Sequence, residues 1–463
     1  MFQALNAARS RIAPLAVATV SFAHRAPFSD SNERCDPTVC HCESNNSTAA
    51  PAPANQDPYR VLVVGSGLTG CLTALRIRQR ANDRGKPVDI TMVERATYPA
   101  GRFAATATYQ GCIADIGAQV LSTINPLDHR ALGGHGVEVK DIKLADDLVR
   151  KLISHRTIAQ ARDEALGETE ERMLWEGLWI HYFAPAGLVS VMQKLLDWAD
   201  VQPLFSVRID SIDTESSDAS VSVKGVVRRF TEDEADASTA YSESYDCVVL
   251  CIPAPDVLDV QGALQNLSEA SRHVLHNVGY DQRVCEAHFF SGEMKEDLTK
   301  AFEDGNGVEI MVEDVDDEIQ YISWQNRKSS DRACHDNNSV IVLVAHGQTG
   351  HLDTLGNSLD RTLSKLTGKT EDEIASCRLY SKSIPWHTSQ MITPMEAVVS
   401  DPPSPAWQCI AGKDRRLIIA GDFMTQSSFV GCVASADAAA RAVIEGSSVG
   451  HGKSKERYVA TSS

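Results

Sequence analysis

The sequence lacks the patterns that mark several common classes of protein. None of its twelve cysteines forms a C-x-x-C pair or an obvious zinc-binding spacing, and no apolar run is long and unbroken enough to span a bilayer. Neither a nucleophile elbow nor a Ser-His-Asp order is present, and no internal repeat is visible. The sequence therefore gives no support to a membrane span, a zinc centre, hydrolase chemistry or a repeat architecture.

Basic charge is also scarce. The chain has 44 Lys and Arg against 62 Asp and Glu, which gives a formal net charge of −18 at pH 7. Such a balance argues against nucleic acid or an anionic membrane as the main partner, and it says little about a small substrate. Any bound phosphate must then be neutralised by a local basic residue.

The cysteines are scattered along the chain rather than paired by motif. Cys247 and Cys251 lie inside the apolar run CVVLC, where a free thiol behaves as a small hydrophobic group. We therefore expect most cysteines to be reduced residues of the core. Cys35, Cys40 and Cys42, beside His41, could bind a metal, but their segment is rich in Ser, Asn and Pro, so we expect no metal site.

The first residues differ in composition from the rest of the chain. They contain Arg9, Arg11 and Arg25, and no acidic residue precedes Asp30. This composition is typical of an organellar transit peptide, for a mitochondrion or a plastid. A secretory signal is the alternative, and a cytoplasmic location is the third. Residues 1–57 are expected to comprise this targeting segment and a disordered linker, and residues 447–463 a flexible tail.

The strongest motif is VLVVGSGLTG in residues 61–70, where an apolar run ends in a G-x-G-x-x-G triplet and continues as a helix. Gly65 permits the tight turn, Gly67 lets a pyrophosphate approach the backbone, and Gly70 allows close packing of helix on strand. Thr69 lies in the first turn of that helix, whose N-terminus attracts phosphates. Glu94, after a second apolar run, suits a ribose hydroxyl pair. The motif therefore predicts a bound dinucleotide.

Two further apolar runs, in residues 247–258 and 416–423, are typical of buried parallel strands. We therefore expect an α/β fold with a Rossmann-like nucleotide domain and a second, α+β substrate domain. The nucleotide domain is discontinuous and comprises residues 58–125, 186–262 and 406–446. Residues 126–185 and 263–405 form the substrate domain.

Other residues could complete the site. Arg102 can send a guanidinium fork to the pyrophosphate, and the small residues before Gln119 let the backbone pass beside a flat ring. Gly421 and Asp422 end the last strand, where an acid can hold a ribityl or ribose hydroxyl. Gly431 and Cys432 open the final helix, whose N-terminal dipole suits the negative edge of a reduced flavin.

These stretches resemble the FAD-containing oxidases of the glutathione-reductase-like superfamily, which includes p-hydroxybenzoate-hydroxylase-like folds, and most closely the renalase family. The matching segments include AGRFAAT, ADIGAQV, FAPAGLVSVMQ and GDFMTQSSFVGCVASA, spread over residues 59–445. The resemblance implies non-covalent FAD, hydride transfer from dihydronicotinamide isomers of NAD(P)H, and reoxidation by O2 to give H2O2. It also implies that FAD contacts Thr69, Glu94, Arg102, Gln119, Val120, Ile209 and Asp422.

The substrate side is less clearly specified. Trp386 is a candidate aromatic wall, and His387 could orient a carboxamide or shuttle a proton. Gln390 completes the segment, and His181 and Tyr182 are weaker candidates. Animal renalases show Trp-Arg-His-Ser-Gln where this chain has Trp-His-Thr-Ser-Gln, which puts the substrate preference in question.

Two alternatives to the dihydronicotinamide oxidase stay open. One is a flavin amine oxidase. Enzymes of that kind usually place a lysine near flavin N5, and the stretch VGYDQRVCEAHFF in residues 278–290 has none. The other is a catalytically idle FAD-binding protein.

Overall fold

The computed structural model describes residues 57–99, 101–125, 137–161, 179–214, 220–228, 238–302, 308–311, 318–328, 340–348, 355–393, 408–412 and 415–446. All of them belong to one compact unit, residues 55–463. The expected targeting segment, the cysteine cluster near His41 and the expected tail lie outside the described residues. Within the described part, no helix is long and apolar enough to cross a membrane.

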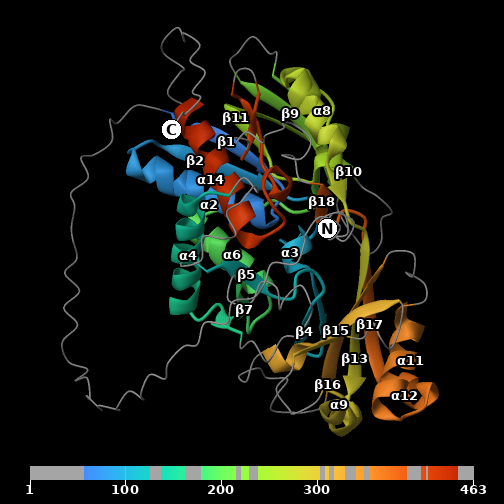
Figure 1. The fold of residues 1–463 in the computed structure, drawn as a ribbon. Helices are drawn as coiled ribbons and strands as arrows, with labels where there is room; N and C mark the ends of the chain where they lie inside the picture. Colours follow the sequence, from blue (N-terminus) through green and yellow to red (C-terminus); the bar gives the residue numbers. More distant parts are fainter. Residues whose placement is uncertain are drawn as a thin grey trace, which may run out of the picture. The chain divides into compact units, whose positions relative to one another are not determined.

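A five-stranded sheet forms the nucleotide-binding half of the fold (Figure 1). Its strand order is β19 (Ile410–Ala411), β20 (Leu417–Ile419), β11 (Cys247–Leu250), β1 (Tyr59–Val64) and β2 (Val88–Val93). The last four strands pair in parallel, and β19 pairs antiparallel with β20. The three apolar runs that are far apart in the sequence thus do lie side by side, which confirms the predicted sheet.

Alternation along β1 explains the layers on this sheet. Val61 and Val63 join an apolar cluster with the helices α2 (Leu68–Asp83), α6 (Val189–Ala199) and α14 (Phe429–Gly446). Leu62 and Val64 pack on the opposite face, against the antiparallel strands β8 (Val207–Asp213), β9 (Val221–Arg228) and β10 (Ser238–Tyr245). Successive side chains point to opposite faces of a strand, so a fully apolar strand must be covered on both.

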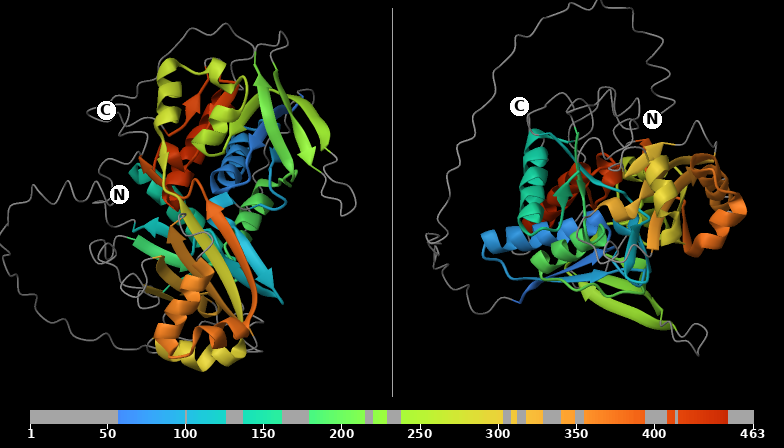
Figure 2. Two further views of the ribbon diagram at one scale, coloured as in Figure 1. Left: turned by 90° about the vertical axis from the view of Figure 1, so that its right-hand side faces the viewer. Right: turned by 90° about the horizontal axis from the view of Figure 1, so that it is seen from below.

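A second five-stranded sheet is antiparallel and forms the other half of the fold (Figure 2). Its order is β14 (Glu309–Met311), β15 (Ile319–Trp324), β16 (Val340–Gln348), β13 (Arg283–Ser291) and β17 (Arg378–Trp386). One face packs on α9 (Lys295–Ala301) and α11 (Leu355–Thr367). The other face packs on the hairpin of β3 (Thr106–Tyr109) and β4 (Cys112–Asp115). In the sequence, that hairpin follows β1, α2 and β2 of the parallel sheet. Because it packs on the antiparallel sheet, it connects the two halves.

Smaller elements complete the described structure. A three-stranded sheet contains β5 (Leu121–Ile124), β7 (Trp179–Phe183) and β6 (Ala159–Gln160), and a pair contains β12 (Gly279–Tyr280) and β18 (Met391–Thr393). The remaining helices are α3 (Gly101–Ala104), α4 (Val139–Ser154), α7 (Ala254–Asp259), α8 (Glu269–Asn277) and α12 (Glu371–Cys377). The 3-10 turns are η3 (Ala263–Asn266), η4 (Gly292–Met294), η5 (Gln325–Lys328) and η7 (Asp422–Met424).

Two local findings add to the sequence-based expectations. Helix α4 packs in the same apolar cluster as α2 and α14, so this part of residues 126–185 lies with the helices of the parallel sheet. Seven described cysteines are free, as expected for core thiols. Cys112, however, is disulfide-bonded, so the expectation of a reduced thiol is wrong at that position.

Candidate active site

The glycine loop after β1 has the form that the sequence predicts. Gly65 adopts φ +96°, and its N–H donates to the carbonyl of Val93 at 2.8 Å. A Cβ on Gly70 would collide with the carbonyl oxygen of Gly65, so helix and strand meet too closely for any other residue. A Cβ on Gly67, the N-cap of α2, would meet no atom within 4 Å. The N-terminus of α2 is therefore open to a phosphate on the side of Gly67.

Glu94 holds this loop to the end of β2. Its Oε2 accepts hydrogen bonds from the backbone N–H of Ser66 at 2.8 Å and from the Ser66 hydroxyl at 3.0 Å. Its Oε1 accepts from the N–H of Ala96 at 2.9 Å. A carboxylate has about four acceptor positions, so a ribose hydroxyl could still bind beside these three donors. The expected ribose contact is compatible with this geometry.

Arg102 and Asp422 meet although they are 320 positions apart in the sequence. The guanidinium donates to Asp422 Oδ1 at 2.6 Å and to the backbone carbonyl of Ser389 at 2.9 Å. It also lies over the ring of Tyr280, 5.4 Å from its centroid. The pair therefore joins the first βαβ unit, the end of the parallel sheet and the antiparallel half at one point.

The electrostatics of this junction keep the arginine charged. Burial opposes the charged guanidinium of Arg102, but the charge of Asp422, the interaction with Tyr280 and the hydrogen bond to Asp422 together outweigh it, and the pKa of Arg102 is raised. Burial, and then the charge of Asp422, raise the pKa of the Tyr280 hydroxyl and raise the pKa of the Cys432 thiol to about 12. Near neutral pH the junction thus holds one ion pair among neutral groups.

The loop before α14 brings further predicted residues to this junction. The Ser427 hydroxyl donates to Asp422, and the N–H of Gly421 donates to the Ser435 hydroxyl at 3.0 Å. Thr69, on α2, is hydrogen-bonded to Cys432, on α14. A Cβ on Gly431 would collide with the carbonyl oxygen of Gln426. Close packing thus explains the glycine at the start of the last helix.

Gln119 lies in a buried polar network rather than facing open space. Its amide nitrogen donates to the carbonyl of Asp115 at 2.5 Å and to that of Gly117 at 3.4 Å. Its oxygen accepts from Gln325 at 2.6 Å and from Lys328 at 3.0 Å. All four hydrogen-bonding positions of the amide are thus used. Its side chain orients the loop 115–119, and an FAD contact from the amide itself would require one of these bonds to break.

Lys328 is the charged centre of that network, and sequence reasoning missed it. Its ammonium lies 3.2 Å from Asp115 Oδ2, and the two side chains are 0% and 1% exposed. Asp115 Oδ1 accepts from the N–H of Leu188 at 2.9 Å. Lys328 ends η5, directly after β15, so it links the antiparallel sheet to the loop 115–119. The only indication of this site in the sequence was a basic residue shortly after an apolar strand.

The remaining predicted FAD contacts lie on neighbouring strands and loops. Ile209 lies in β8, which begins beside Glu94, because the N–H of Val207 donates to the Glu94 carbonyl at 2.8 Å. Val120 packs beside Ala161 and Phe183, at the edge of a small apolar cluster.

Of the three predicted substrate-side residues, Trp386 reaches the loop 115–119. Its indole N–H donates to the carbonyl of Ile116 at 3.1 Å. The side chains of His387 and Gln390 are exposed. The carbonyl of Gln390 accepts from the N–H of Asp281 at 2.7 Å, which fixes the segment after β17. The weaker candidate His181 lies elsewhere, on β7, with its Nδ1 2.7 Å from the Ser122 hydroxyl.

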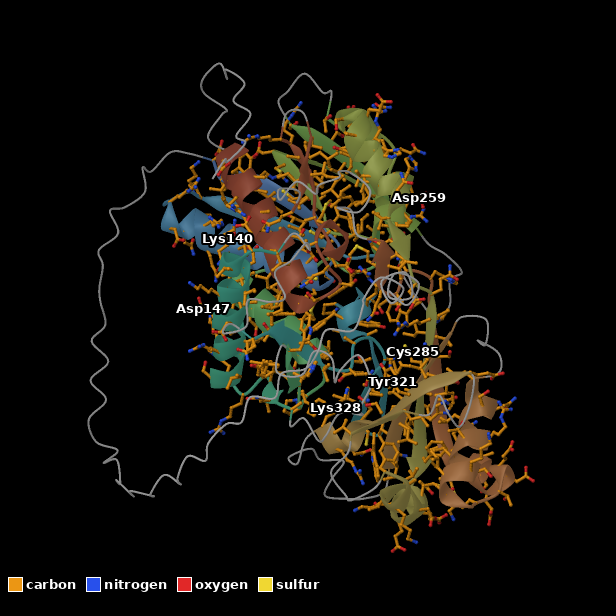
Figure 3. The ribbon with its side chains drawn as sticks, in the orientation of Figure 1. Lys140, Asp147, Asp259, Cys285, Tyr321 and Lys328 are labelled. Carbon is orange, nitrogen blue, oxygen red and sulfur yellow. The ribbon has the colours of Figure 1, made fainter. Side chains whose placement is uncertain are left out.

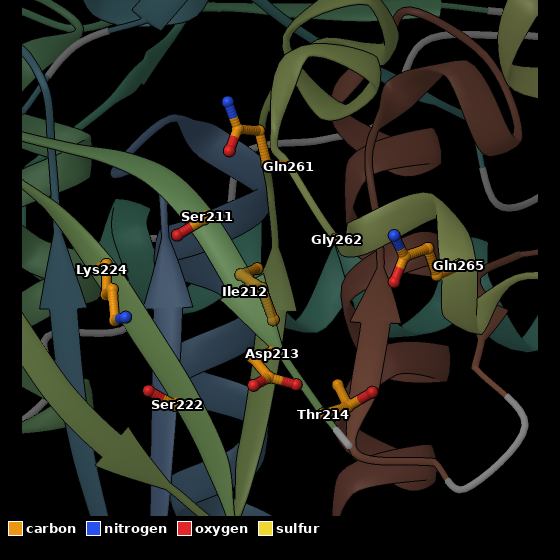
Figure 4. Close-up of a pocket in the computed structure, with 9 residues that line it drawn as sticks. All are labelled: Ser211, Ile212, Asp213, Thr214, Ser222, Lys224, Gln261, Gly262 and Gln265. Carbon is orange, nitrogen blue, oxygen red and sulfur yellow. The ribbon is translucent and has the colours of Figure 1, made fainter. Parts of the chain in front are cut away.

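A polar cavity of about 270 Å³ lies apart from these residues (Figure 4). Its lining comes from β8, β9 and the connection from α7 to η3, and it contains none of the residues predicted to bind FAD. The lining residues are Ser211, Ile212, Asp213, Thr214, Ser222, Lys224, Gln261, Gly262 and Gln265. The junction of Arg102 and Asp422, and not this cavity, is the candidate active site.

Comparisons with the sequences of known proteins agree with the Rossmann-like fold of the parallel sheet and its glycine loop. Residues 63–132 match the NAD(P)-binding Rossmann-like domain family. Renalase of Mus musculus is 25% identical to this chain over 392 residues, which cover 81% of this chain and 96% of the mouse protein. A solved structure of a putrescine oxidase triple mutant, redesigned in cofactor binding, covers 84% of this chain and 100% of its own, with a TM-score of 0.47 and 10% identity.

The Rossmann-like sheet, the glycine loop and the sequence matches define the class of the protein, an FAD-dependent oxidoreductase. Within that class the chain is renalase-like, and the similarity extends over nearly the whole of the mouse renalase.

Proposed function

We propose that the chain is a renalase-like oxidase that oxidises dihydronicotinamides, the isomers of NAD(P)H. The observation that carries this proposal is the hydrogen bond from Trp386 to the carbonyl of Ile116. It fixes an aromatic side chain of the antiparallel sheet on the loop expected to lie beside the flavin. A flat, uncharged substrate ring needs such a wall for stacking, and the transfer itself needs little acid–base machinery.

The residues of the junction fit FAD. Gly67 and the open N-terminus of α2 would receive the pyrophosphate, and Glu94 would receive a ribose hydroxyl. Asp422 would hold a ribityl hydroxyl, with Arg102 neutralising both it and the nearby phosphates. When bound, FAD supplies a two-electron acceptor that takes hydride from the substrate and passes the electrons to O2, with formation of H2O2.

The chain's own residues then have a positioning task. The network of Gln119, Asp115 and Lys328 would hold the loop 115–119 flat beside the flavin ring. Trp386 would hold the substrate ring against it. Because Tyr280 and Cys432 are neutral near pH 7, neither is expected to act as a base. We therefore expect the rate of flavin reduction to be nearly independent of pH between 6 and 8.

An amine oxidase is the second candidate, and one observation favours keeping it. The stretch 278–290 contains no lysine, but η5 supplies the buried Lys328 beside the loop 115–119. Its ammonium is already paired with Asp115 and hydrogen-bonded to Gln119, so we assign it a structural role. We therefore rank the dihydronicotinamide oxidase above the amine oxidase.

Anaerobic mixing tests this proposal. The purified holoenzyme should lose the visible absorbance of oxidised flavin when mixed with one of the dihydronicotinamide isomers, and air should restore it with formation of H2O2. Bleaching by amines, and not by these isomers, would establish the amine oxidase instead. A protein that retains FAD and is bleached by neither would be the catalytically idle alternative.

Replacement of Arg102 by alanine is expected to weaken retention of FAD. It removes charge-assisted hydrogen bonds worth roughly 1.5–3 kcal/mol and leaves Asp422 without its cationic partner, so the dissociation constant should rise about ten- to a hundred-fold. Fluorescence titration of the apoprotein with FAD measures it. Arg95→Ala is the control, since that arginine forms an exposed ion pair with Asp256 at 3.2 Å. Equal FAD affinity in both variants would contradict the assigned role of Arg102.

A further inference from the structure

His346 is a buried residue of β16, in a row of side chains that crosses the antiparallel sheet. It stands opposite Cys285 on one neighbouring strand and Tyr321 on the other. Its Nδ1 lies 3.1 Å from the Cys285 sulfur, and the Tyr321 ring stacks on the imidazole with centroids 4.2 Å apart. Figure 3 labels Cys285 and Tyr321 at the end of the sheet near α3. The side chain of His346 is only 3% exposed.

One nitrogen of this imidazole has no hydrogen-bond partner in the described part of the chain. It is Nε2, and it is buried. A buried polar group without a partner costs roughly 1–3 kcal/mol, so such groups are rare unless a ligand or water pairs with them. The dyad with Cys285 thus leaves one hydrogen-bonding position of His346 for a bound molecule.

The surroundings fix the protonation of the dyad. Burial, together with the charges of Arg283 and Lys328, lowers the pKa of His346 to about 3. Burial raises the pKa of the Cys285 thiol to about 12. A neutral imidazole nitrogen is a better acceptor than a thiol sulfur, so the S–H donates to Nδ1. The proton of the ring is then on Nε2, which makes this atom a neutral donor of fixed tautomer.

The dyad lies on the face of the sheet that bears Trp386. Cys285 belongs to the apolar cluster of this face, together with Ile116 and Trp386. The indole of Trp386 reaches the loop 115–119. His346 therefore lies on the same face of the sheet as Trp386, which contacts the loop expected to lie beside the flavin.

We propose that His346 Nε2 donates a hydrogen bond to the carboxamide oxygen of the dihydronicotinamide substrate. This inference rests on the proposed function. In a dihydronicotinamide the ring nitrogen pushes electron density onto the conjugated carbonyl, which makes that oxygen a strong acceptor. The pyridinium product draws density away from it. A neutral donor thus favours the reduced substrate over the oxidised product and holds the ring in one orientation.

The test uses two ligands that do not reduce the flavin. The 1,4,5,6-tetrahydronicotinamide dinucleotide keeps the electron-rich carboxamide, and NAD⁺ carries the electron-poor one. Each is titrated into the holoenzyme and followed by the flavin absorbance. His346→Leu should weaken binding of the tetrahydro analogue about ten-fold and binding of NAD⁺ by less. His346→Gln, whose amide can donate from a similar position, should recover most of that loss.

His288→Leu is the matched control. His288 is also fully buried, on β13, but it follows Cys285 by three positions and therefore lies on the opposite face of the sheet. We expect it to change stability and to leave both affinities unchanged. Cys285→Ala is a further test variant, because it keeps the imidazole and removes the group that fixes its tautomer. We expect its affinity for the tetrahydro analogue to fall less than that of His346→Leu.

Two negative results have different meanings. If dihydronicotinamides reduce the flavin of the wild-type enzyme, and the tetrahydro analogue binds the wild type, His346→Leu and Cys285→Ala equally, the role of His346 is overturned while the proposed function stands. If no dihydronicotinamide isomer reduces the wild-type flavin, the proposed function fails, and the carboxamide contact fails with it.

Discussion

Replacement of Lys328 by methionine is expected to lower the free energy of unfolding by about 3–5 kcal/mol, because it leaves a buried carboxylate without its cation. Asp115, the partner, is 1% exposed, and Gln119 loses a donor at the same time. Urea unfolding of the holoenzyme, followed by circular dichroism, measures the change. The variant should also retain FAD less well, since the loop 115–119 loses its anchor.

Two further variants make this result specific. Lys140→Met removes a lysine whose ion pair with Glu138, at 2.5 Å, is about half exposed, and it should cost less than about 1 kcal/mol. Figure 3 labels both lysines. Adding Asp115→Asn to Lys328→Met removes the unpaired charge and should recover part of the stability. A Lys328→Met protein as stable as the Lys140→Met protein would contradict the buried ion pair.

Replacement of Asp437 by asparagine is the second substitution with a large expected effect. This carboxylate on α14 is ion-paired with Arg76 at 2.7 Å, with Arg80 at 2.8 Å and with Arg441 at 3.3 Å, and its side chain is 7% exposed. The first two arginines belong to α2, so the carboxylate links the two central helices. Its loss leaves three partly buried cations facing one another, and we expect a decrease of about 3–5 kcal/mol in the free energy of unfolding.

The pH dependence of this loss follows from the pKa of Asp437. Burial opposes the charged carboxylate, but the hydrogen bonds and charges of Arg80 and Arg76 outweigh it, and the pKa is lowered. A carboxyl whose folded pKa lies below its unfolded value stabilises the protein above the unfolded pKa, and that stability is lost as the pH falls through the folded pKa. The difference between wild type and Asp437→Asn should therefore be full at pH 7 and shrink below about pH 4.

Asp146→Asn is the control for Asp437. Asp146 forms an ion pair with Arg150 on the surface of α4, with the arginine 74% exposed, and its loss should cost about 0.3–0.5 kcal/mol. Thermal unfolding of the three proteins over a pH series compares them. A deficit in Asp437→Asn that is as small as that of the control, or that grows on acidification, would contradict the network.

Local sequence signals were sufficient to predict the glycine loop and the strands beside it. The turn at Gly65, the helix after Gly67 and the acid at Glu94 follow from spacing and periodicity within about 35 residues. The apolar runs at β11 and β20 were recognisable because strands buried on both faces are continuously apolar. The positions at which residues 126–185 and 263–405 divide from the nucleotide domain stay a prediction.

Contacts between distant segments could not be predicted in the same way. Nothing near Arg102 in the sequence indicates that Asp422 will be its partner, since the fold alone brings the two together. Gln119 was expected to contact FAD, and no local pattern shows that Lys328 and Gln325 use its oxygen. In the sequence, His346 is a polar residue at the end of an apolar strand, where it could equally be a surface residue. Only the strand register shows that it lies between Cys285 and Tyr321.

The order of strands in the parallel sheet has a consequence for synthesis of the protein. β20, from residues 417–419, pairs with β11, and α14, which ends at residue 446, fills the core over α2. The glycine loop is made early, whereas Asp422 is made 320 residues after its partner Arg102. The apolar strands β1 and β11 therefore stay partly uncovered until residues 417–446 have been synthesised. The complete dinucleotide site can form only after that point.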